Sequence, residues 1–192
     1  MEEHEWKILK EFSMLLKIGI GLIVLILAFV TFVSSRPGSF RIERSALVSA
    51  PPEKVFPLIN DFHQWKRWSP WEKLDPNMKT SFSGPEAGPG SSYAWSGNGK
   101  AGEGRMTIQE SKPAELVSVT LEFTKPMKAT NKTKFSLSPA AGGTMVKWEM
   151  TGKNGFMGKA FSVFANMDKM VGGDFEKGLA ALNTEAQAEA KK

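Results

Sequence analysis

The strongest constraint on this fold is an uncharged apolar segment near the N-terminus, which runs from Ile18 to Val33 with the sequence IGIGLIVLILAFVTFV. Extending it back to Leu15 adds Lys17, whose aliphatic stem can lie in lipid while its ammonium reaches the interface. At about 1.5 Å per residue, roughly 19 helical residues cover about 28 Å, close to the thickness of the hydrocarbon core of a bilayer. The sequence therefore predicts a single-pass transmembrane helix from Leu15 to Val33 in the cell membrane, with the lipid bilayer as its partner.

A cleaved signal peptide is the competing interpretation of this segment, with Val33-Ser34-Ser35 as a loose small-residue cleavage site. The apolar run exceeds the roughly 7–15 residues usual in signal peptides, and four glutamates precede it where such peptides are basic. Orientation is balanced, because three basic residues flank each side: Lys7, Lys10 and Lys17 before the segment, and Arg36, Arg41 and Arg44 after it. Since an uncleaved N-terminal anchor usually leaves the following domain outside the cytoplasm, we expect an extracytoplasmic soluble domain.

The chain's 192 residues suit one anchor and one domain, since domains typically have about 100–150 residues. We expect an N-terminal tail at 1–14, the transmembrane helix at 15–34, a linker at 35–39, the domain at 40–185 and a tail at 186–192. The sequence has no cysteine and only two histidines, His4 and His63, so no cofactor, metal site or catalytic residue is predicted. The net charge of +5 is scattered, which favours attraction to anionic lipid over binding of nucleic acid.

Alternation of apolar and polar residues begins at Phe40 and indicates strands. In the clearest case, Val117, Val119 and Leu121 share one side of a strand and polar residues occupy the other. Two short helices are expected after the first strand, one opened by Ser49-Ala-Pro-Pro-Glu, whose Pro and Glu favour a first helical turn, and one at about 62–68. The seven expected strands cover residues 40–48, 79–83, 92–95, 104–110, 117–123, 131–137 and 145–150.

A long C-terminal helix is expected over about residues 157–186, with an apolar stripe at helical spacing. The stripe comprises Phe161, Phe164, Asp168, Val171, Phe175, Leu179 and Leu182. Gly172-Gly173 in mid-helix costs about 1 kcal/mol per glycine relative to alanine, which indicates a bend or a close approach of sheet to helix. A single antiparallel sheet needs its apolar face covered, so the predicted fold class is α+β, with a curved antiparallel sheet of about seven strands wrapped on this helix and one N-terminal transmembrane helix.

The element order and several motifs resemble the START/SRPBCC superfamily, which includes the birch-pollen allergen and the polyketide cyclase/dehydrase-like branch. The resemblance covers about residues 40–182 and implies the helix-grip fold, with a hydrophobic cavity between sheet and helix. Members bind lipids, sterols, polyketides or plant hormones, a minority catalyse, and no shared catalytic motif can be carried over. The motifs are Ser49-Ala-Pro-Pro-Glu-Lys-Val-Phe, Trp65-Lys-Arg-Trp-Ser-Pro-Trp-Glu, Asp75-Pro-Asn-Met, Ser83-Gly-Pro, Gly88-Pro-Gly and Asn166-Met-Asp-Lys-Met-Val-Gly-Gly-Asp-Phe-Glu-Lys-Gly-Leu.

The candidate ligand-binding residues are those expected to face the space between sheet and helix, where they either line a cavity or fill it. Asp168 is the one acid on the apolar stripe, so it is either a polar anchor for a ligand or the partner of a basic residue on the sheet. The cluster of Trp65, Trp68 and Trp71 either gates a cavity mouth or packs the short helices against the sheet. The candidate cavity residues are Tyr93, Trp95, Met106, Phe123, Phe135, Trp148, Phe164 and Asp168.

Three functions remain open at this point. The favoured one is membrane-anchored binding of a small apolar or amphipathic, lipid-like ligand in a cavity between sheet and C-terminal helix. The second is an accessory or structural subunit of a larger membrane protein complex. The third is a cyclase- or hydrolase-like enzyme, which the sequence favours least because no acid–base pair stands out and His63 would have to serve alone. A continuous cavity would favour binding, and a filled core beside an exposed apolar patch would favour the subunit.

Overall fold

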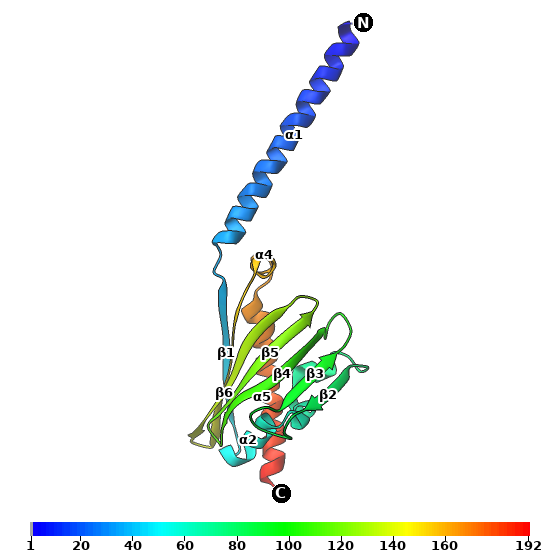
Figure 1. Cartoon of the computed structure of the whole chain (residues 1–192). Coiled ribbons are helices and arrows are strands. Elements are labelled where there is room, and N and C mark those ends of the chain that lie inside the picture. The colour runs from blue at the N-terminus through cyan, green and yellow to red at the C-terminus, as the bar shows by residue number, and fades with distance from the viewer. Residues whose placement is uncertain (1) are drawn as a thin grey trace. The chain divides into compact units, whose positions relative to one another are not determined.

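The computed structural model describes residues 2–192, with the side chains of all of them except residues 2, 3 and 8. The chain forms two compact units. The helical unit comprises the residues up to Gly38 together with Gly155–Ala165, and the sheet domain comprises Ser39–Asn154 together with Asn166–Lys192. Figure 1 shows the helices and strands of both units.

The helical unit consists of a long helix α1 (Glu2–Ser35) and a short helix α4 (Phe156–Phe164). The mean hydropathy of α1 reaches 2.7 in its most apolar 18-residue window, and 6% of that window is buried. By length and composition this helix meets the requirement for a membrane span, which a signal sequence near an N-terminus also meets. The helix is continuous from Glu2 to Ser35. It therefore includes both the residues expected to form an N-terminal tail and those expected to span the membrane.

The sheet domain is built on one seven-stranded antiparallel sheet, as expected from the sequence. The strand order is β1-β7-β6-β5-β4-β3-β2, so only β1 is displaced from its sequence neighbour. A register shift between Ile108 and Glu110 interrupts the pairing of β4 with β5, and such irregularities bend a sheet locally. The strands are β1 (Ser39–Val48), β2 (Lys79–Ser83), β3 (Ser92–Ser96), β4 (Glu103–Lys112), β5 (Leu116–Lys125), β6 (Ala129–Ala140) and β7 (Gly143–Lys153).

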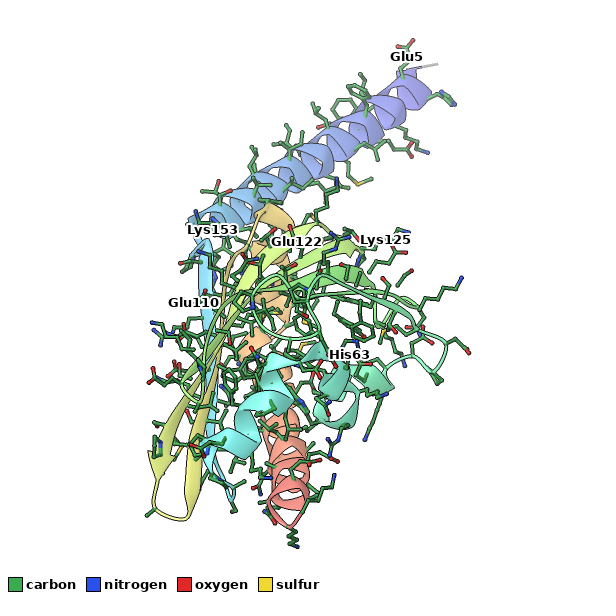
Figure 2. All side chains as sticks on the ribbon, turned by 60° about the horizontal axis from the view of Figure 1, so that its bottom comes forward. Glu5, His63, Glu110, Glu122, Lys125 and Lys153 are labelled. Atoms are coloured by element: carbon green, nitrogen blue, oxygen red, sulfur yellow. The ribbon has the colours of Figure 1, made fainter. Side chains whose placement is uncertain are left out.

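The two faces of the sheet follow from the period of two along each strand. On β5, Val117 and Val119 are buried on the inward face, whereas Glu122 on the opposite face is exposed. Lys125 pairs with Glu103 across a register shift and is also exposed, despite its even spacing from Val117 and Val119. Glu110 on β4 is exposed as well, and Figure 2 shows these charged side chains around the sheet. One face of the sheet is therefore available for a hydrophobic core.

The helices that cover the inward face come from two parts of the chain, as Figure 1 shows. Pro52 and Glu53 in the first turn of α2 suit a helix start, because proline needs no hydrogen-bond acceptor there and glutamate complements the helix dipole. From α5, Phe175, Leu179 and Leu182 point into the core and are each no more than 1% exposed. The covering elements are α2 (Pro52–Asn60), the 3₁₀ helix η1 (Phe62–Gln64), α3 (Trp65–Trp68), the 3₁₀ helix η2 (Pro70–Lys73) and α5 (Met167–Ala190).

The expectation of one helix over about residues 157–186 is wrong, because the chain breaks between α4 and α5. Ala165 and Asn166 both have extended backbone, and the side-chain oxygen of Asn166 accepts a hydrogen bond from the backbone N–H of Lys169 at 3.0 Å. Asparagine is among the strongest N-cap residues, so Asn166 starts a new helix. The break assigns Phe161 and Phe164 to the helical unit and leaves the rest of the predicted stripe, from Asp168 onward, on α5.

Candidate ligand-binding site

One half of the space between sheet and helix is filled by aromatic rings. Trp148 of β7 stacks on Phe175 of α5 with ring centroids 4.2 Å apart and planes 5° from parallel. Phe135 of β6 contacts Trp148, and Trp65 and Trp68 of α3 meet Phe135 edge-on. All five side chains are at most 3% exposed. Phe135 and Trp148 thus have the inward position expected from the sequence, and they fill the interior there instead of lining an open space.

The indole nitrogens of this cluster differ in their hydrogen bonding. Trp65 Nε1 donates to the carbonyl of Ile59 at 2.9 Å, and Trp68 Nε1 donates to the carbonyl of Leu58 at 2.8 Å. Both tryptophans therefore pack the short helices onto the sheet, which is one of the two roles expected for this cluster. The Nε1 of Trp148 is buried and has no hydrogen-bond partner within the described residues. An unpaired buried donor is uncommon in folded proteins.

The other half of the inward face is less completely covered. Trp95 of β3, Met106 of β4, and Leu121 and Phe123 of β5 are each partly buried, and we call these four residues the apolar shelf. The strand register makes them a contiguous surface, because Met106 lies opposite Leu121 and the Trp95 and Phe123 rings meet edge-on with centroids 5.6 Å apart. The shelf contains three of the residues predicted from the sequence, and it adds Leu121.

A glycine on β4 allows the side chains of the shelf on the two neighbouring strands to approach each other. Gly104 lies opposite Trp95 on one side and Phe123 on the other. A Cβ at this position would lie within 2.6 Å of Cζ2 of Trp95 and would also collide with the backbone carbonyl of Glu122. Only glycine therefore allows the Trp95 ring to approach β4 this closely.

Polar neighbours border this apolar surface. Asn131 of β6 lies opposite Leu121 and is 7% exposed, and Thr133 beside it is 5% exposed. Both are on the inward face, since they alternate with the outward Lys132 and Lys134. A mainly apolar surface with a few polar groups at its edge is the usual composition of a small-molecule site.

Tyr93 takes part in a structural hydrogen bond. Its hydroxyl donates to a carboxylate oxygen of Glu72 on η2 at 2.6 Å. Burial, and then the nearby Glu72 carboxylate, raises the pKa of the Tyr93 phenol far above its ordinary value. Tyr93 therefore remains a protonated donor that holds η2 against β3, and this keeps it from acting as a base at physiological pH.

Asp168 is located at the edge of α5, where it forms an ion pair with Arg44. The two Asp168 oxygens accept hydrogen bonds from Nη1 and Nη2 of Arg44, each at 3.0 Å, and Glu176 accepts from Nε at 2.7 Å. The hydrogen bonds from Arg44 lower the pKa of the Asp168 carboxyl. The Asp168 side chain is 58% exposed, so of the two expected roles the structure shows the ion pair with a basic sheet residue.

Phe164 lies outside the sheet domain altogether. It is the last residue of α4 in the helical unit and is 80% exposed. Of the eight predicted site residues, the structure thus places three on the shelf and three in the packed part of the core, while Asp168 and Phe164 lie elsewhere.

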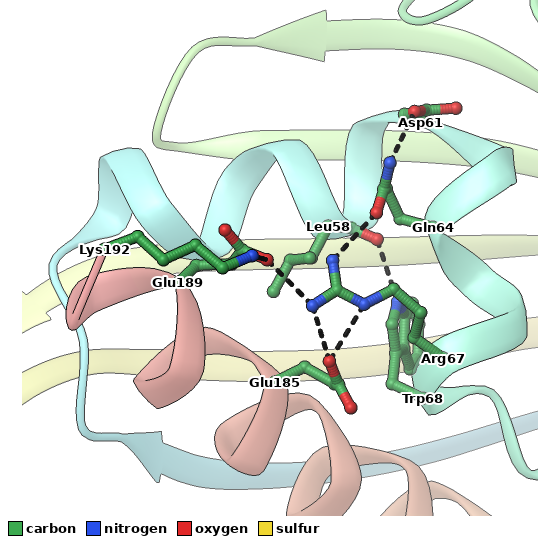
Figure 3. Close-up of polar contacts among 8 residues, drawn as sticks. All are labelled: Leu58, Asp61, Gln64, Arg67, Trp68, Glu185, Glu189 and Lys192. Atoms are coloured by element: carbon green, nitrogen blue, oxygen red, sulfur yellow. Dashed lines mark hydrogen bonds and ion pairs between the residues drawn. The ribbon is translucent and has the colours of Figure 1, made fainter.

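A second concave region lies on the outside of α2. It is a surface groove of about 640 Å³ whose lining includes Phe56 and Pro57 from α2 and Glu86 and Ala87 from the loop before β3. Arg67 lies at one end, and Figure 3 shows its guanidinium already bonded to Gln64 at 3.0 Å, Glu185 at 2.9 Å and Glu189 at 2.8 Å. Because its own neighbours occupy its guanidinium, Arg67 is not free to bind an anionic ligand in the groove.

His63 is held at the surface of the sheet domain by two neighbours (Figure 2). Its Nδ1 lies 2.7 Å from Oδ1 of Asp61, and its ring stacks on Phe82 with centroids 4.0 Å apart. These contacts link η1 to β2 and account for the residue structurally. Among the side chains that the structure describes, no three from His, Asp or Glu lie close enough together to hold a metal ion.

A family model described as polyketide cyclase / dehydrase and lipid transport matches residues 39–187. The chain belongs to this family. The match spans nearly all of the sheet domain, which ends at Lys192, and it confirms the START/SRPBCC resemblance and the helix-grip fold. No curated protein matches the chain.

The matches to three solved structures cover nearly the whole length of each of those proteins. Protein CV1439 from Chromobacterium violaceum is 17% identical, with a TM-score of 0.56, and the match covers 79% of this chain and 99% of that one. Protein SA2116 from Staphylococcus aureus, of unknown function, is 16% identical, with a TM-score of 0.57 and coverage of 80% and 97%. The structure of Ara h 8.0201 is 18% identical, with a TM-score of 0.53 and coverage of 80% and 98%. At these sequence identities, the structural similarity establishes only the fold of the chain.

Sequence reasoning placed Leu121 on the apolar side of its strand but did not include it among the candidate site residues, and it did not single out Arg44. Leu121 carries the same signal as Phe123, since both belong to one alternating strand. For Arg44 the signal was its position, because Ile42, Arg44 and Ala46 alternate on the inward side of β1. A charged residue at an inward position requires a partner, and that requirement pointed to an acid on the covering helix.

Proposed function

We propose that this family member binds a small apolar or amphipathic molecule on the apolar shelf, while α1 anchors the protein in a membrane. The proposal combines two features of the chain, namely a fold whose family description includes lipid transport and an N-terminal helix with the length and hydropathy of a span. Such a molecule would lie with its apolar part across Trp95, Met106 and Phe123. Its polar end would lie toward Asn131.

The observation that carries the proposal is the uneven covering of the inward face. Trp148, Phe175 and Phe135 are each at most 1% exposed, whereas the four residues of the shelf stay partly exposed although they are large and apolar. Burying one such side chain completely is worth about 1.5–3 kcal/mol, so a contiguous set left half-covered is available to a ligand.

The packed half of the interior favours a second candidate, an accessory subunit of a membrane protein complex. In that case the shelf would need no small molecule, and the sheet domain would bind protein partners through its surface. The two functions differ in what copurifies with the full-length protein, namely a small molecule or stoichiometric polypeptides.

Native mass spectrometry of the full-length protein, extracted from its own membrane in mild detergent, tests the proposal. We expect a stoichiometric small-mass adduct that is lost in Met106→Ala and in Phe123→Ser. The matched control is Met145→Ala, which removes a methionine from the outward face of β7, where the side chain is 38% exposed. Circular dichroism of each variant shows whether the fold is retained.

The outcomes separate the alternatives. An adduct that survives both shelf variants, or that disappears equally in Met145→Ala, is inconsistent with a ligand on the shelf. A protein that carries no adduct but travels with stoichiometric polypeptides is instead an accessory subunit. A bare monomer under the same conditions contradicts both candidates.

A further inference from the structure

Helix α4 exposes its apolar face, whereas a surface helix in water normally exposes its polar face. At 100° per residue, Phe156, Met157, Phe161 and Phe164 fall on one side of the helix, and their exposures are 45%, 64%, 47% and 80%. The polar residues Lys159 and Ser162 lie on the opposite side and are partly buried. A surface helix in a soluble domain has the reverse arrangement, so the exposed face of α4 requires an apolar partner.

The contacts of α4 within the helical unit locate it at one end of α1. The ring of Phe164 lies 6.3 Å from that of Phe29, and Nζ of Lys159 donates to the carbonyl of Ser34 at 3.0 Å. Phe29 is near the end of the apolar segment of α1, and Ser34 is the first residue beyond it. If α1 spans a bilayer, this end of the helix lies at the depth of the lipid head groups, and α4 lies at the same depth.

The charge around α4 suits an anionic lipid surface. Residues 151–167 contain no Asp or Glu, while Lys153 precedes α4 and Lys159 lies within it. Lys153 is exposed (Figure 2). Juxtamembrane basic residues are attracted to anionic lipids by about 1 kcal/mol each, and aromatic residues favour the interface.

We propose that α4 is an interfacial membrane helix, which inserts its exposed apolar face among the lipid head groups beside the point where α1 leaves the bilayer. This inference rests on the membrane anchor of the proposed function, and the ligand on the shelf plays no part in it. The occupant of the α4 face is lipid, because the helix lies against the end of α1 and carries cationic neighbours without an acid. The chain therefore meets the membrane at two sites that are more than 120 residues apart in sequence, around Phe29 and around Phe164.

Site-directed spin labelling of the full-length chain tests this, since the sequence has no cysteine and each introduced cysteine is the sole label site. Single variants Met157→Cys and Phe164→Cys report on α4, Leu25→Cys reports on the middle of α1, and Ser138→Cys on β6 serves as an exposed reference in the sheet domain. Each labelled protein is reconstituted into phosphatidylcholine vesicles with and without phosphatidylglycerol. Power saturation then compares collisions of the label with lipid-soluble oxygen and with a water-soluble nickel chelate.

We expect the ratio of oxygen to nickel collisions at positions 157 and 164 to exceed that at position 138 severalfold and to remain below that at position 25. Nickel-dominated collisions at 157 and 164, with oxygen-dominated collisions at 25, would overturn the interfacial helix and leave the anchor intact. Nickel-dominated collisions at 25 would overturn the anchor itself. Labels at 157 and 164 that meet neither reagent would show that protein, such as a second copy of the chain, covers the face instead of lipid.

Discussion

Arg44 illustrates how one residue fixes the relation between the sheet and its covering helix. Its guanidinium is bonded to both oxygens and the backbone carbonyl of Asp168, to Glu176 and to the carbonyl of Glu43. These bonds use the full planar fork of the guanidinium, which a lysine at this position would not reproduce. Arg44 thus ties β1 to the first three turns of α5.

The ion pair of Asp168 gives a prediction about pH. Because Arg44 lowers the pKa of Asp168 below its ordinary value of 3.8, this carboxylate stabilises the folded chain above that value, and its contribution is lost as the pH falls through the lower, folded pKa. Asp168→Asn should therefore lower the melting temperature at neutral pH, and the difference from the wild type should shrink below about pH 4. Thermal unfolding followed by circular dichroism across the acid range measures this.

The matched control for this prediction is Asp174→Asn. Asp174 lies on the same helix but pairs within it, with Lys177 at 2.8 Å, and it makes no bond to the sheet. Its replacement should have a smaller effect at neutral pH. A melting-temperature difference for Asp168→Asn that stays constant or grows toward low pH would contradict the role assigned to the ion pair.

Single residues show which parts of the site the sequence could reveal. Alternation placed Phe123, Phe135 and Trp148 on the inward face, because the period of two depends only on local pattern. Burial along that face was not predictable, since Trp148 is covered by Phe175 and Phe123 is not covered to the same extent, and this depends on where a distant helix crosses the sheet. The partner of Asp168 was also beyond local reasoning, as Arg44 is 124 residues away.

At the scale of elements, three glycines of α5 differ in how closely neighbouring residues approach them. Gly172 lies against the guanidinium of Arg44, so a Cβ there would collide with it. At Gly178 a Cβ would lie 2.7 Å from Cζ3 of Trp148 and 3.2 Å from Cδ of Pro70. Gly173 has nothing within 4 Å. The close approach expected from Gly172-Gly173 is thus present at the first glycine of that pair and absent at the second.

These surroundings predict opposite effects for two similar substitutions. Gly173→Ala should raise the free energy of unfolding by about 0.5–1 kcal/mol, because alanine favours the helix and meets no neighbour. Gly178→Ala should lower it by about 1–3 kcal/mol, because the new methyl group pushes α5 away from Trp148 and η2. Denaturant unfolding of the full chain in detergent measures both. Equal effects of the two variants would show that helix propensity alone controls this helix.

The order of strands and helices in the sheet domain was predictable, whereas the break before α5 was missed. The apolar spacing continues across the break, so periodicity alone favours one helix. The signal that could have revealed it is local: Asn166 is a strong N-cap residue, and Asp168 in the first turn complements the helix dipole. As a consequence, the break separates α4 and its exposed aromatic residues from the core helix.

At the scale of the whole molecule, the two units differ in whether their large apolar side chains are buried or exposed. In the sheet domain, the inward face of the sheet and one side of α5 cover each other, apart from the shelf. In the helical unit, the large apolar residues from Leu15 to Phe32 and those of α4 remain exposed. Two units of such different surface chemistry are what a protein needs if one part meets lipid and the other meets water.

The side of the membrane on which the sheet domain lies is a further property of the whole chain, and it can be tested directly. Ser138 lies on the exposed side of β6 in the sheet domain, and His4 is exposed before the apolar segment of α1. If the helix spans the membrane as an uncleaved anchor, cysteines at these two positions lie on opposite sides. In right-side-out membrane vesicles, a membrane-impermeant maleimide should label Ser138→Cys directly and His4→Cys only after the vesicles are permeabilised.

The absence of native cysteine makes the unmodified chain a control without background in this experiment. The reverse labelling pattern would place the sheet domain in the cytoplasm, which the equal number of basic residues on the two flanks of the segment permits. Labelling of both positions without permeabilisation would contradict a span. Loss of the His4→Cys label from the mature protein, detected by a mass that begins near Ser34, would show instead that the segment is a signal peptide, and α4 would then lack the anchor beside which it is proposed to lie.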